Sequence, residues 1–331
     1  MAEAGHILVI RFSAMGDVAM SAAVLRDFRS VYPEMKVTLI SRSLFQPFFN
    51  GIPDLKFHPF APKMDHKGFL GLLKLFLELR KQRITHVADL HNNLRSTILC
   101  ILLFLTGVRI RRLDKGRDEK KKLTRKLHKE LIPLKQTIQR YADVFSALGF
   151  PFALMQRQNV QNQANTWIGV SPFAQHLQKV YPLHKMEAVV LQLAAQGYQL
   201  FIFGGSDEEA QIAANWETKH PNIKSVIQQM SLSEELELIA GLRLMISMDS
   251  SGMHMAALKN VPVVSIWGAT HPFTGFLGYG QQLEDTVQID LYCRPCSVYG
   301  NIPCYRGDFA CMNNLPEAQI LDKVYQHLNH G

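Results

Sequence analysis

Acidic, hydroxyl and imidazole side chains are concentrated in one short segment, LMISMDSSGMHMAALKNVPVVSIW, residues 244–267. The segment predicts a strand, a turn, a short helix and a second strand. Asp249, Ser250 and Ser251 fall in the turn, and His254 follows about one helical turn later. Ligands of open parallel sheets bind at the carboxyl ends of the strands, and a helix that begins there favours an anion such as a phosphate. An ordinary helix capped by Asp249, with a buried histidine, is the alternative.

The segment FSAMGDV, residues 12–18, follows the first predicted strand and is the second candidate. Its residues Ser13, Ala14 and Gly16 are small, so the backbone can turn tightly and approach a ligand closely. Asp17 stands at the start of the next helix, where a carboxylate could act as general base toward a hydroxyl nucleophile. Asp17 could also simply cap that helix. The spacing is not G-x-G-x-x-G, so a dinucleotide fingerprint is not supported.

Two further loops follow predicted strands in the second half of the chain. SPFAQHLQKVYP, residues 171–182, carries Lys179, whose ammonium could neutralise a diphosphate or could simply be exposed. FGGSDEE, residues 203–209, offers carboxylates that could accept hydrogen bonds from ribose hydroxyls. Each loop is weak evidence alone, but three such loops on the strand-end side of one domain are harder to dismiss.

Four of the five cysteines form a cluster, Cys293, Cys296, Cys304 and Cys311. Four thiolates can bind a tetrahedral zinc ion, although the spacing is not that of a paired CxxC finger. The other interpretation is a set of reduced or redox-labile thiols that hold a loop. Cys100 lies in an apolar helix and is expected in the core.

The net charge of +8 is unevenly distributed, because eleven lysines and arginines but only three acidic residues lie between Arg109 and Lys129. Such a block attracts phosphates of nucleic acid, anionic lipid or a phosphorylated glycolipid, or it is a solvated loop. No aromatic residue lies within it, which argues against nucleic acid as a partner. The helix GFLGLLKLFLEL, residues 68–79, has little polar surface; it predicts either core packing or contact with a membrane surface.

The 331 residues favour two domains, and alternating strand and helix patterns in both halves predict an α/β fold. We expect domains at residues 1–155 and 165–331, joined by a linker at 151–166, and the final helix could pack back on the first domain. No signal peptide or spanning segment is visible, so a cytoplasmic protein is expected. The predicted strands are 6–10, 36–40, 85–90, 167–170, 199–203, 244–247 and 263–267, and the predicted helices are 17–31, 69–81, 95–105, 136–148, 185–196, 208–219, 233–241 and 316–327.

These segments together resemble the ADP-heptose:lipopolysaccharide heptosyltransferases of glycosyltransferase family 9. The resemblance covers nearly the whole chain and includes SAMGD at 13–17, DLHNNLRS at 89–96 and QMSLSEELELIAG at 229–241. Its strongest part is MDSSGMHMAAL at 248–258 followed by VPVVSIWGATHP at 261–272. It implies the GT-B fold, in which two Rossmann-like domains face each other across a cleft.

The resemblance also implies roles for individual residues. Asp17 matches the family's proposed general base, which deprotonates a hydroxyl of the acceptor sugar. On the donor side it assigns Lys179 to the phosphates, Asp207 to the ribose, Met230 to the adenine, and Asp249, Ser250, Ser251 and His254 to the diphosphate and sugar. We expect the phosphates of the acceptor to bind Arg95, Lys120, Lys121 and Lys122.

The implied activity is an inverting transfer of heptose, or a related sugar, from an ADP-sugar to a lipopolysaccharide core-type glycolipid at the inner membrane surface. The scheme requires no metal or other cofactor. One departure concerns the donor: the family usually has glycine two residues after the aspartate, whereas Ser251 stands there and Gly252 follows. A different nucleotide-sugar donor, or a non-catalytic nucleotide-sugar-binding homologue, therefore stays open.

Overall fold

The computed structural model describes residues 5–157 and 165–329. The chain divides into two compact units, and each contains one parallel sheet. Unit 1 comprises the residues up to Lys115 together with Thr137–Met155, and unit 2 comprises Gly116–Gln136 and the residues from Gln156 onward. Part of the linker predicted at 151–166, residues 158–164, lies outside the described residues.

The sheet of unit 1 has the strand order β3-β2-β1-β4-β5. Its strands are β1 (His6–Ile10), β2 (Lys36–Ser41), β3 (Leu55–Pro59), β4 (His86–Asp89) and β5 (Arg109–Arg112). The chain leaves β1 toward β2 on one side and later returns to β4 on the other. The carboxyl ends of β1 and β4 therefore form the topological switch point, where such sheets bind ligands.

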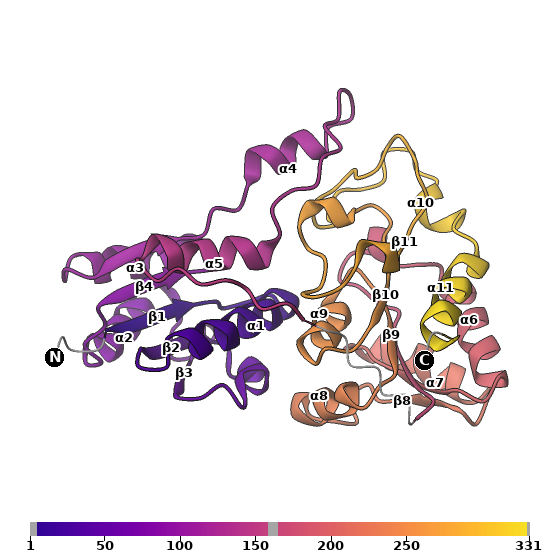
Figure 1. Ribbon diagram of the computed structural model, residues 1–331, viewed down its shortest axis with the longest axis horizontal. Helices are drawn as coiled ribbons and strands as arrows, with labels where there is room; N and C mark the ends of the chain where they lie inside the picture. Colours follow the sequence, from indigo (N-terminus) through magenta and orange to yellow (C-terminus); the bar gives the residue numbers. More distant parts are fainter. Residues whose placement is uncertain (1–4, 158–164, 330–331) are drawn as a thin grey trace. The chain divides into compact units, whose positions relative to one another are not determined.

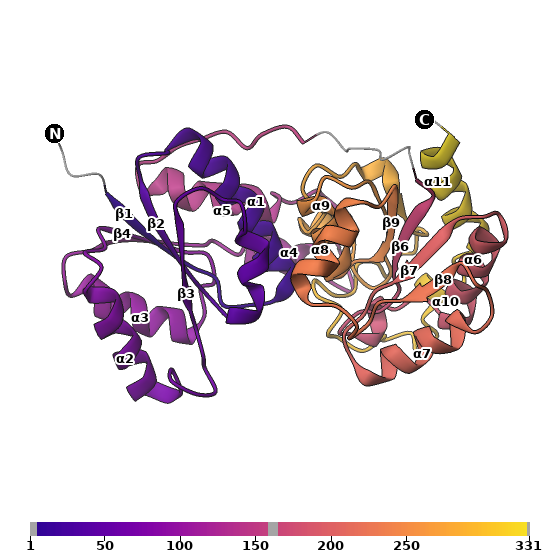
Figure 2. The same cartoon turned by 90° about the horizontal axis from the view of Figure 1, so that it is seen from below.

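Four helices cover the two faces of this sheet (Figure 2). Helices α2 (Gly68–Arg80) and α3 (Leu94–Phe104) contact each other on one face, and α1 (Met15–Val31) and α5 (Thr137–Ala147) contact each other on the opposite face. The core between β1 and the α2/α3 layer contains Leu8, Ile10, Leu75 and Leu99. A short 3-10 helix, η1 (Ser43–Phe49), contacts α1 and β3.

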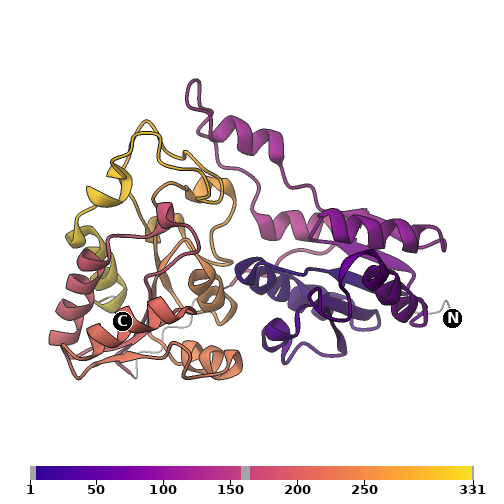
Figure 3. The same cartoon turned by 180° about the vertical axis from the view of Figure 1, so that it is seen from behind.

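Unit 2 repeats this architecture with the strand order β11-β10-β9-β6-β7-β8. Helices α8 (Leu232–Ala240) and α9 (Ser251–Leu258) lie on one side of the sheet, and α6 (Leu183–Ala195) and α11 (Glu317–Asn329) lie on the other (Figures 2 and 3). The strands are β6 (Trp167–Ser171), β7 (Gln199–Ile202), β8 (Ile223–Ser225), β9 (Leu244–Met248), β10 (Val263–Ile266) and β11 (Thr286–Val287). Further helices are α7 (Asp207–Glu217) and α10 (Ala310–Asn313), with 3-10 turns at Leu177–Lys179, Pro272–Thr274 and Leu283–Asp285.

The segment 116–136, which contains α4 (Arg117–Leu123), packs with unit 2 although it interrupts unit 1 in the sequence (Figure 1). The backbone N–H of Leu134 donates to the carbonyl of Phe273 at 2.9 Å, and the Lys129 ammonium donates to the carbonyls of Cys293 and Pro295 at 2.8 Å. The sequence placed this segment in a domain of residues 1–155, whereas its contacts join it to unit 2.

The predicted α/β class is confirmed: both sheets are parallel and are covered by helices. The four edge strands, β3 and β5 of unit 1 and β8 and β11 of unit 2, were not predicted, and β5 occupies the beginning of the presumed basic loop. The final helix α11 contacts α6 and strands β9 to β11, so it packs on the sheet of unit 2. None of the helices in the described part of the chain combines the length and hydrophobicity needed to cross a bilayer.

Candidate functional site

The predicted donor residues follow four neighbouring strands of unit 2. Asp249 comes directly after β9, Lys179 lies in the loop after β6, Asp207 begins the helix after β7, and Met230 lies in the loop after β8. These strands are adjacent in the order β9-β6-β7-β8. Because parallel strands share one carboxyl edge, all four residues lie along the same edge of the sheet. The edge includes the switch point between β6 and β9.

A buried ion pair occupies this switch point. The Lys179 ammonium lies 2.9 Å from a carboxylate oxygen of Asp249, and the two side chains are 15% and 7% exposed. Gly300 packs closely against the side chain of Lys179, because a Cβ at residue 300 would lie 2.5 Å from Lys179 Cγ. The sequence left open the alternative that Asp249 is the N-cap of the next helix, and the structure excludes it. Ser250 is the N-cap of α9, and Asp249 instead pairs with Lys179.

Helix α9 begins at the same point and contains the predicted hydroxyl and imidazole groups. The Ser250 side chain makes no capping hydrogen bond, and its buried hydroxyl has no partner. Ser251 is partly exposed at the first helical position, whereas His254 is buried one turn later. Gly252 lies against β6, because a Cβ there would be 2.4 Å from Ser171 Oγ. Packing of the helix on the sheet therefore requires this glycine.

Asp207 and the loop of Met230 are linked by a hydrogen bond. Gln228 Nε2 donates to Asp207 Oδ1 at 2.7 Å, and Met230 lies two residues further along the same loop with 38% of its surface exposed. Glu209 accepts from the backbone N–H groups of Gly205 and Ser206 in a capping box. Asp207 is therefore the carboxylate of FGGSDEE that is hydrogen-bonded to the loop containing Met230.

Asp17 lies in unit 1 at the other switch point, after β1. Its carboxylate forms an ion pair with the buried Arg11 guanidinium and accepts a hydrogen bond from the Tyr141 hydroxyl at 3.2 Å. Arg11 in turn donates to the carbonyl of Leu90, which follows β4, at 2.6 Å. Asp17 is not the helix N-cap, because Ala14 holds that position. Arg11 and Tyr141 fix the orientation of a carboxylate whose side chain is 27% exposed.

The loop after β4 is ordered by a fully buried carboxylate, Asp89. It accepts hydrogen bonds from the backbone of His91 and Asn92, from the Ser96 hydroxyl and from Arg112 Nε, all between 2.8 and 3.0 Å. Burial, and then the charge of Arg11, lower the pKa of His91 to about 4, so this imidazole is neutral near pH 7. The loop beside Asp17 is therefore fixed, and Arg112 of the basic block has a structural role.

The predicted acceptor residues differ in their surroundings. Lys120 is buried, and its ammonium lies 4.4 Å from the centroid of the Phe276 ring within unit 2. Lys121 and Lys122 are exposed on α4, and Lys122 lies 3.6 Å from Glu130. Arg95 is exposed in the first turn of α3 in unit 1. The packed position of Lys120 leaves the other three as the available cations of this set.

The four clustered cysteines line one cavity of unit 2 together with Arg294 and Arg306. All are free thiols, and burial raises the pKa of Cys311 to about 11 and also raises that of Cys296. No three of the four sulfurs, all of which belong to described residues, lie within 4.8 Å of one another. The described arrangement is therefore one of free thiols around a cavity. Cys100 is buried in the core of unit 1, as predicted.

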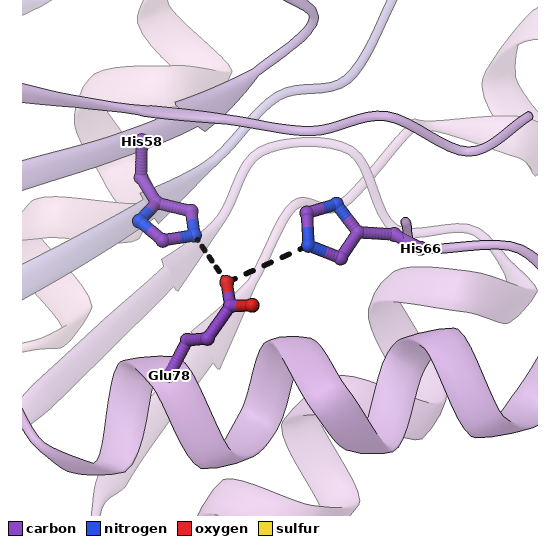
Figure 4. A group of neighbouring side chains, drawn as sticks. All are labelled: His58, His66 and Glu78. Carbon is purple, nitrogen blue, oxygen red and sulfur yellow. Dashed lines mark hydrogen bonds and ion pairs between the residues drawn. The ribbon is translucent and has the colours of Figure 1, made fainter. Parts of the chain in front are cut away.

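His58, His66 and Glu78 form a group that was not predicted (Figure 4). A carboxylate oxygen of Glu78 lies 3.2 Å from His58 Nε2 and 3.5 Å from His66 Nε2. The three ligand atoms are close enough to hold a metal ion. However, the backbone N–H of Ala61 donates to His66 Nδ1 at 3.0 Å, so the ring hydrogen belongs on Nε2 and points at Glu78. This tautomer fits a hydrogen-bonded cluster better than a metal ligand.

Comparison with known proteins identifies the family. The sequence model of glycosyltransferase family 9 (heptosyltransferase) matches residues 72–303. The chain belongs to this family. It is 26% identical over 301 residues to lipopolysaccharide heptosyltransferase 2 of Escherichia coli K12, an alignment that covers 80% of this chain and 83% of that protein. The resemblance predicted from the sequence is therefore confirmed.

Solved structures of family members share the fold. The family 9 glycosyl transferase of Veillonella parvula matches with a TM-score of 0.74 at 16% identity, covering 99% of this chain and 98% of that chain. The E. coli heptosyltransferase WaaC with ADP-2-deoxy-2-fluoro heptose matches with a TM-score of 0.69 at 16% identity, covering 97% and 99%. These matches confirm the GT-B class for two parallel-sheet units.

Proposed function

We propose that this family 9 protein is an inverting glycosyltransferase that moves heptose, or a related sugar, from an ADP-sugar to a phosphorylated lipopolysaccharide core-type glycolipid. The Lys179–Asp249 pair at the switch point of unit 2 is the main support, because it places a cation beside the start of α9. The ADP-heptose analogue on the E. coli relative and the name of the lipopolysaccharide heptosyltransferase favour the donor and acceptor.

In the proposed reaction, Asp17 takes the proton from a hydroxyl of the acceptor. The oxygen of that hydroxyl attacks the anomeric carbon of the donor sugar at the same time. The bond from that carbon to the ADP oxygen breaks on the opposite face, so the configuration inverts. Lys179 can keep one N–H on Asp249 and donate another to the diphosphate, since an ammonium has three donors. With the N-terminus of α9, it would stabilise the charge that develops on ADP.

The remaining roles are proposals of the same kind. Unit 2 would bind the donor, with Asp207 at the ribose, Met230 at the adenine, and Ser250, Ser251 and His254 at the diphosphate and sugar. Unit 1 would bind the acceptor, with Arg95 at its phosphates. Lys121 and Lys122 of segment 116–136, which packs with unit 2, are the other proposed ligands of these phosphates. The transfer as written uses no metal ion. Zinc at the cysteine cluster is the second candidate for that site, and metal analysis of the purified protein distinguishes it from free thiols.

Replacement of Asp17 by Asn tests the catalytic part of the proposal. We expect turnover of an ADP-sugar to fall about 10²- to 10⁴-fold, because the general base is removed, while ADP still raises the melting temperature. Asp54→Asn is the matched control, since Asp54 is an exposed carboxylate in the same unit. Full activity of Asp17→Asn would exclude the general base, and stabilisation by UDP or GDP but not ADP would exclude the donor.

A further inference from the structure

Helix α3 presents an apolar face to solvent. Leu94, Ile101, Phe104 and Leu105 are 56–77% exposed, while Leu99, Cys100 and Leu103 on the opposite side face the core. The exposed residues at 94, 101 and 105 recur with the period of the helix, so they form one stripe. A helix on the surface of a soluble domain normally has polar residues in this stripe.

Helix α2 has the same character and lies beside α3 (Figure 2). Phe69, Leu70 and Leu77 are 50–78% exposed, and Leu72, Leu75 and Leu79 face the core. The two stripes belong to one layer on one side of the sheet. We call the exposed apolar residues of the two helices, together with their flanking cations, the α2/α3 face.

The cations of the α2/α3 face outnumber its acids. Lys67, Lys74, Arg80, Lys81 and Arg95 are exposed on or next to the two helices. Within residues 63–95, all of which are described, Asp65 is the only exposed carboxylate, and it pairs with Lys74 at 3.0 Å. The acid of α2 itself, Glu78, points toward His58 and His66 (Figure 4).

An apolar surface flanked by lysine and arginine is complementary to an anionic lipid surface. Two copies of this chain could also cover their faces against each other, but a two-fold contact would bring the same cations together on both sides. Helices of 13 and 11 residues are shorter than the ~20 residues needed to span a bilayer. Charge and length therefore both favour a helix pair that lies on the membrane.

We propose that the α2/α3 face docks unit 1 on an anionic phospholipid bilayer, with both helices in the plane of the interface. The exposed leucines and phenylalanines enter the boundary between headgroups and acyl chains, while the lysines and arginines contact lipid phosphates. This inference deepens the proposed function, because a glycolipid acceptor lies in a membrane. It names a surface that does not include Asp17 or the donor residues.

Cosedimentation of the full chain with vesicles tests the inference without any sugar substrate. We expect binding to phosphatidylcholine vesicles that contain phosphatidylglycerol and weak binding to pure phosphatidylcholine, at about 0.1 M salt. Leu70→Gln/Leu77→Gln and Leu94→Gln/Ile101→Gln should each lower the affinity by about 10-fold or more. Lys74→Gln/Lys81→Gln should lower it about 5-fold per charge on the anionic vesicles only.

The controls separate the face from the reaction. Leu44→Gln removes a leucine that is 62% exposed on η1. Because η1 contacts α1, which lies on the opposite face of the sheet from α2 and α3, this variant should leave vesicle binding unchanged. Asp17→Asn should also bind vesicles normally, and the face variants should keep the stabilisation by ADP and their activity on an acceptor without acyl chains. Undiminished binding of both leucine double variants would overturn the proposal. So would a wild-type dimer that these substitutions dissociate, since a second copy would then cover the face.

Discussion

Lys179 has two roles that can be measured separately. Its ammonium neutralises a carboxylate that is 7% exposed, and it is the proposed ligand of the donor diphosphate. Removing one partner of a buried ion pair is costly, because the other charge stays buried without compensation. Replacing both partners removes that cost. Stability and donor binding should therefore respond differently to single and double substitutions.

We expect Lys179→Met to lower the free energy of unfolding by about 2–3 kcal/mol and the affinity for ADP about 10-fold or more. The double variant Lys179→Met/Asp249→Asn should recover most of the stability but none of the ADP affinity. Urea unfolding and calorimetric titration with ADP measure the two quantities. Recovery of ADP binding in the double variant would show that Lys179 serves only to neutralise Asp249.

At the scale of elements, the glycine of helix α9 explains the departure from the family pattern. Gly252 allows the first turn of α9 to approach Ser171 of β6, whereas Ser251 lies at a partly exposed position. The glycine is thus placed where the helix meets the sheet. The serine one position earlier has no such constraint from the sheet and is free to vary.

Two substitutions in α9 should therefore differ in their effect. Gly252→Ala places a Cβ against Ser171 and should lower the free energy of unfolding by about 1–3 kcal/mol. Ser251→Gly, which restores the usual glycine position, should cost at most about 1 kcal/mol. Urea unfolding of both variants provides the comparison. Equal destabilisation would show that the close approach of α9 to β6 is not what requires the glycine.

The central strands were predictable from the sequence, and the edge strands were not. Strands β9 and β10 are nearly continuous apolar runs, each with one serine, because both their faces are covered. The edge strand β5 has the sequence RIRR, and only Ile110 packs against the core. Its three arginines leave no apolar pattern from which a strand could be predicted. The donor loops were recognisable because each follows a buried strand. Tyr141 was not, because it reaches Asp17 from a helix more than 120 residues later in the sequence.

At the scale of the whole molecule, histidines that are partly or fully buried on folding make stability depend on pH. Burial lowers the pKa of His6, His58 and His86, and it lowers the pKa of His91 and His271 to about 4. Below the unfolded value of 6.5 the unfolded chain therefore binds protons that the folded chain does not. Their contribution is complete above pH 6.5 and is lost as the pH falls toward 4.

One carboxyl acts in the opposite direction. Burial raises the pKa of Glu235 to about 7, so its contribution is present below its unfolded value of 4.5 and is lost as the pH rises to about 7. The five histidines outweigh this single group. We expect the free energy of unfolding, measured with urea, to decrease as the pH is lowered from 7 to 5. Each histidine should contribute at most about 1.4 kcal/mol per pH unit to this decrease.

His271→Asn isolates one of these contributions. His271 Nδ1 accepts from the backbone N–H of Phe273 at 3.1 Å, and an asparagine side chain can accept the same hydrogen bond without titrating. The variant should show a shallower pH dependence in the same urea titration. A wild-type protein whose stability is constant or increases on acidification would contradict the assignment.

Segment 116–136 has a consequence for biogenesis. The ribosome makes it within the sequence of unit 1, but the ring that Lys120 contacts, Phe276, is made about 150 residues later. At a translation rate of 5–20 residues per second, segment 116–136 is synthesised on the order of ten seconds before Phe276. Unit 2 cannot complete its own structure from a contiguous piece of nascent chain. A gene fragment beginning at residue 156 would encode the sheet of unit 2 but not segment 116–136, whose Lys120 contacts Phe276.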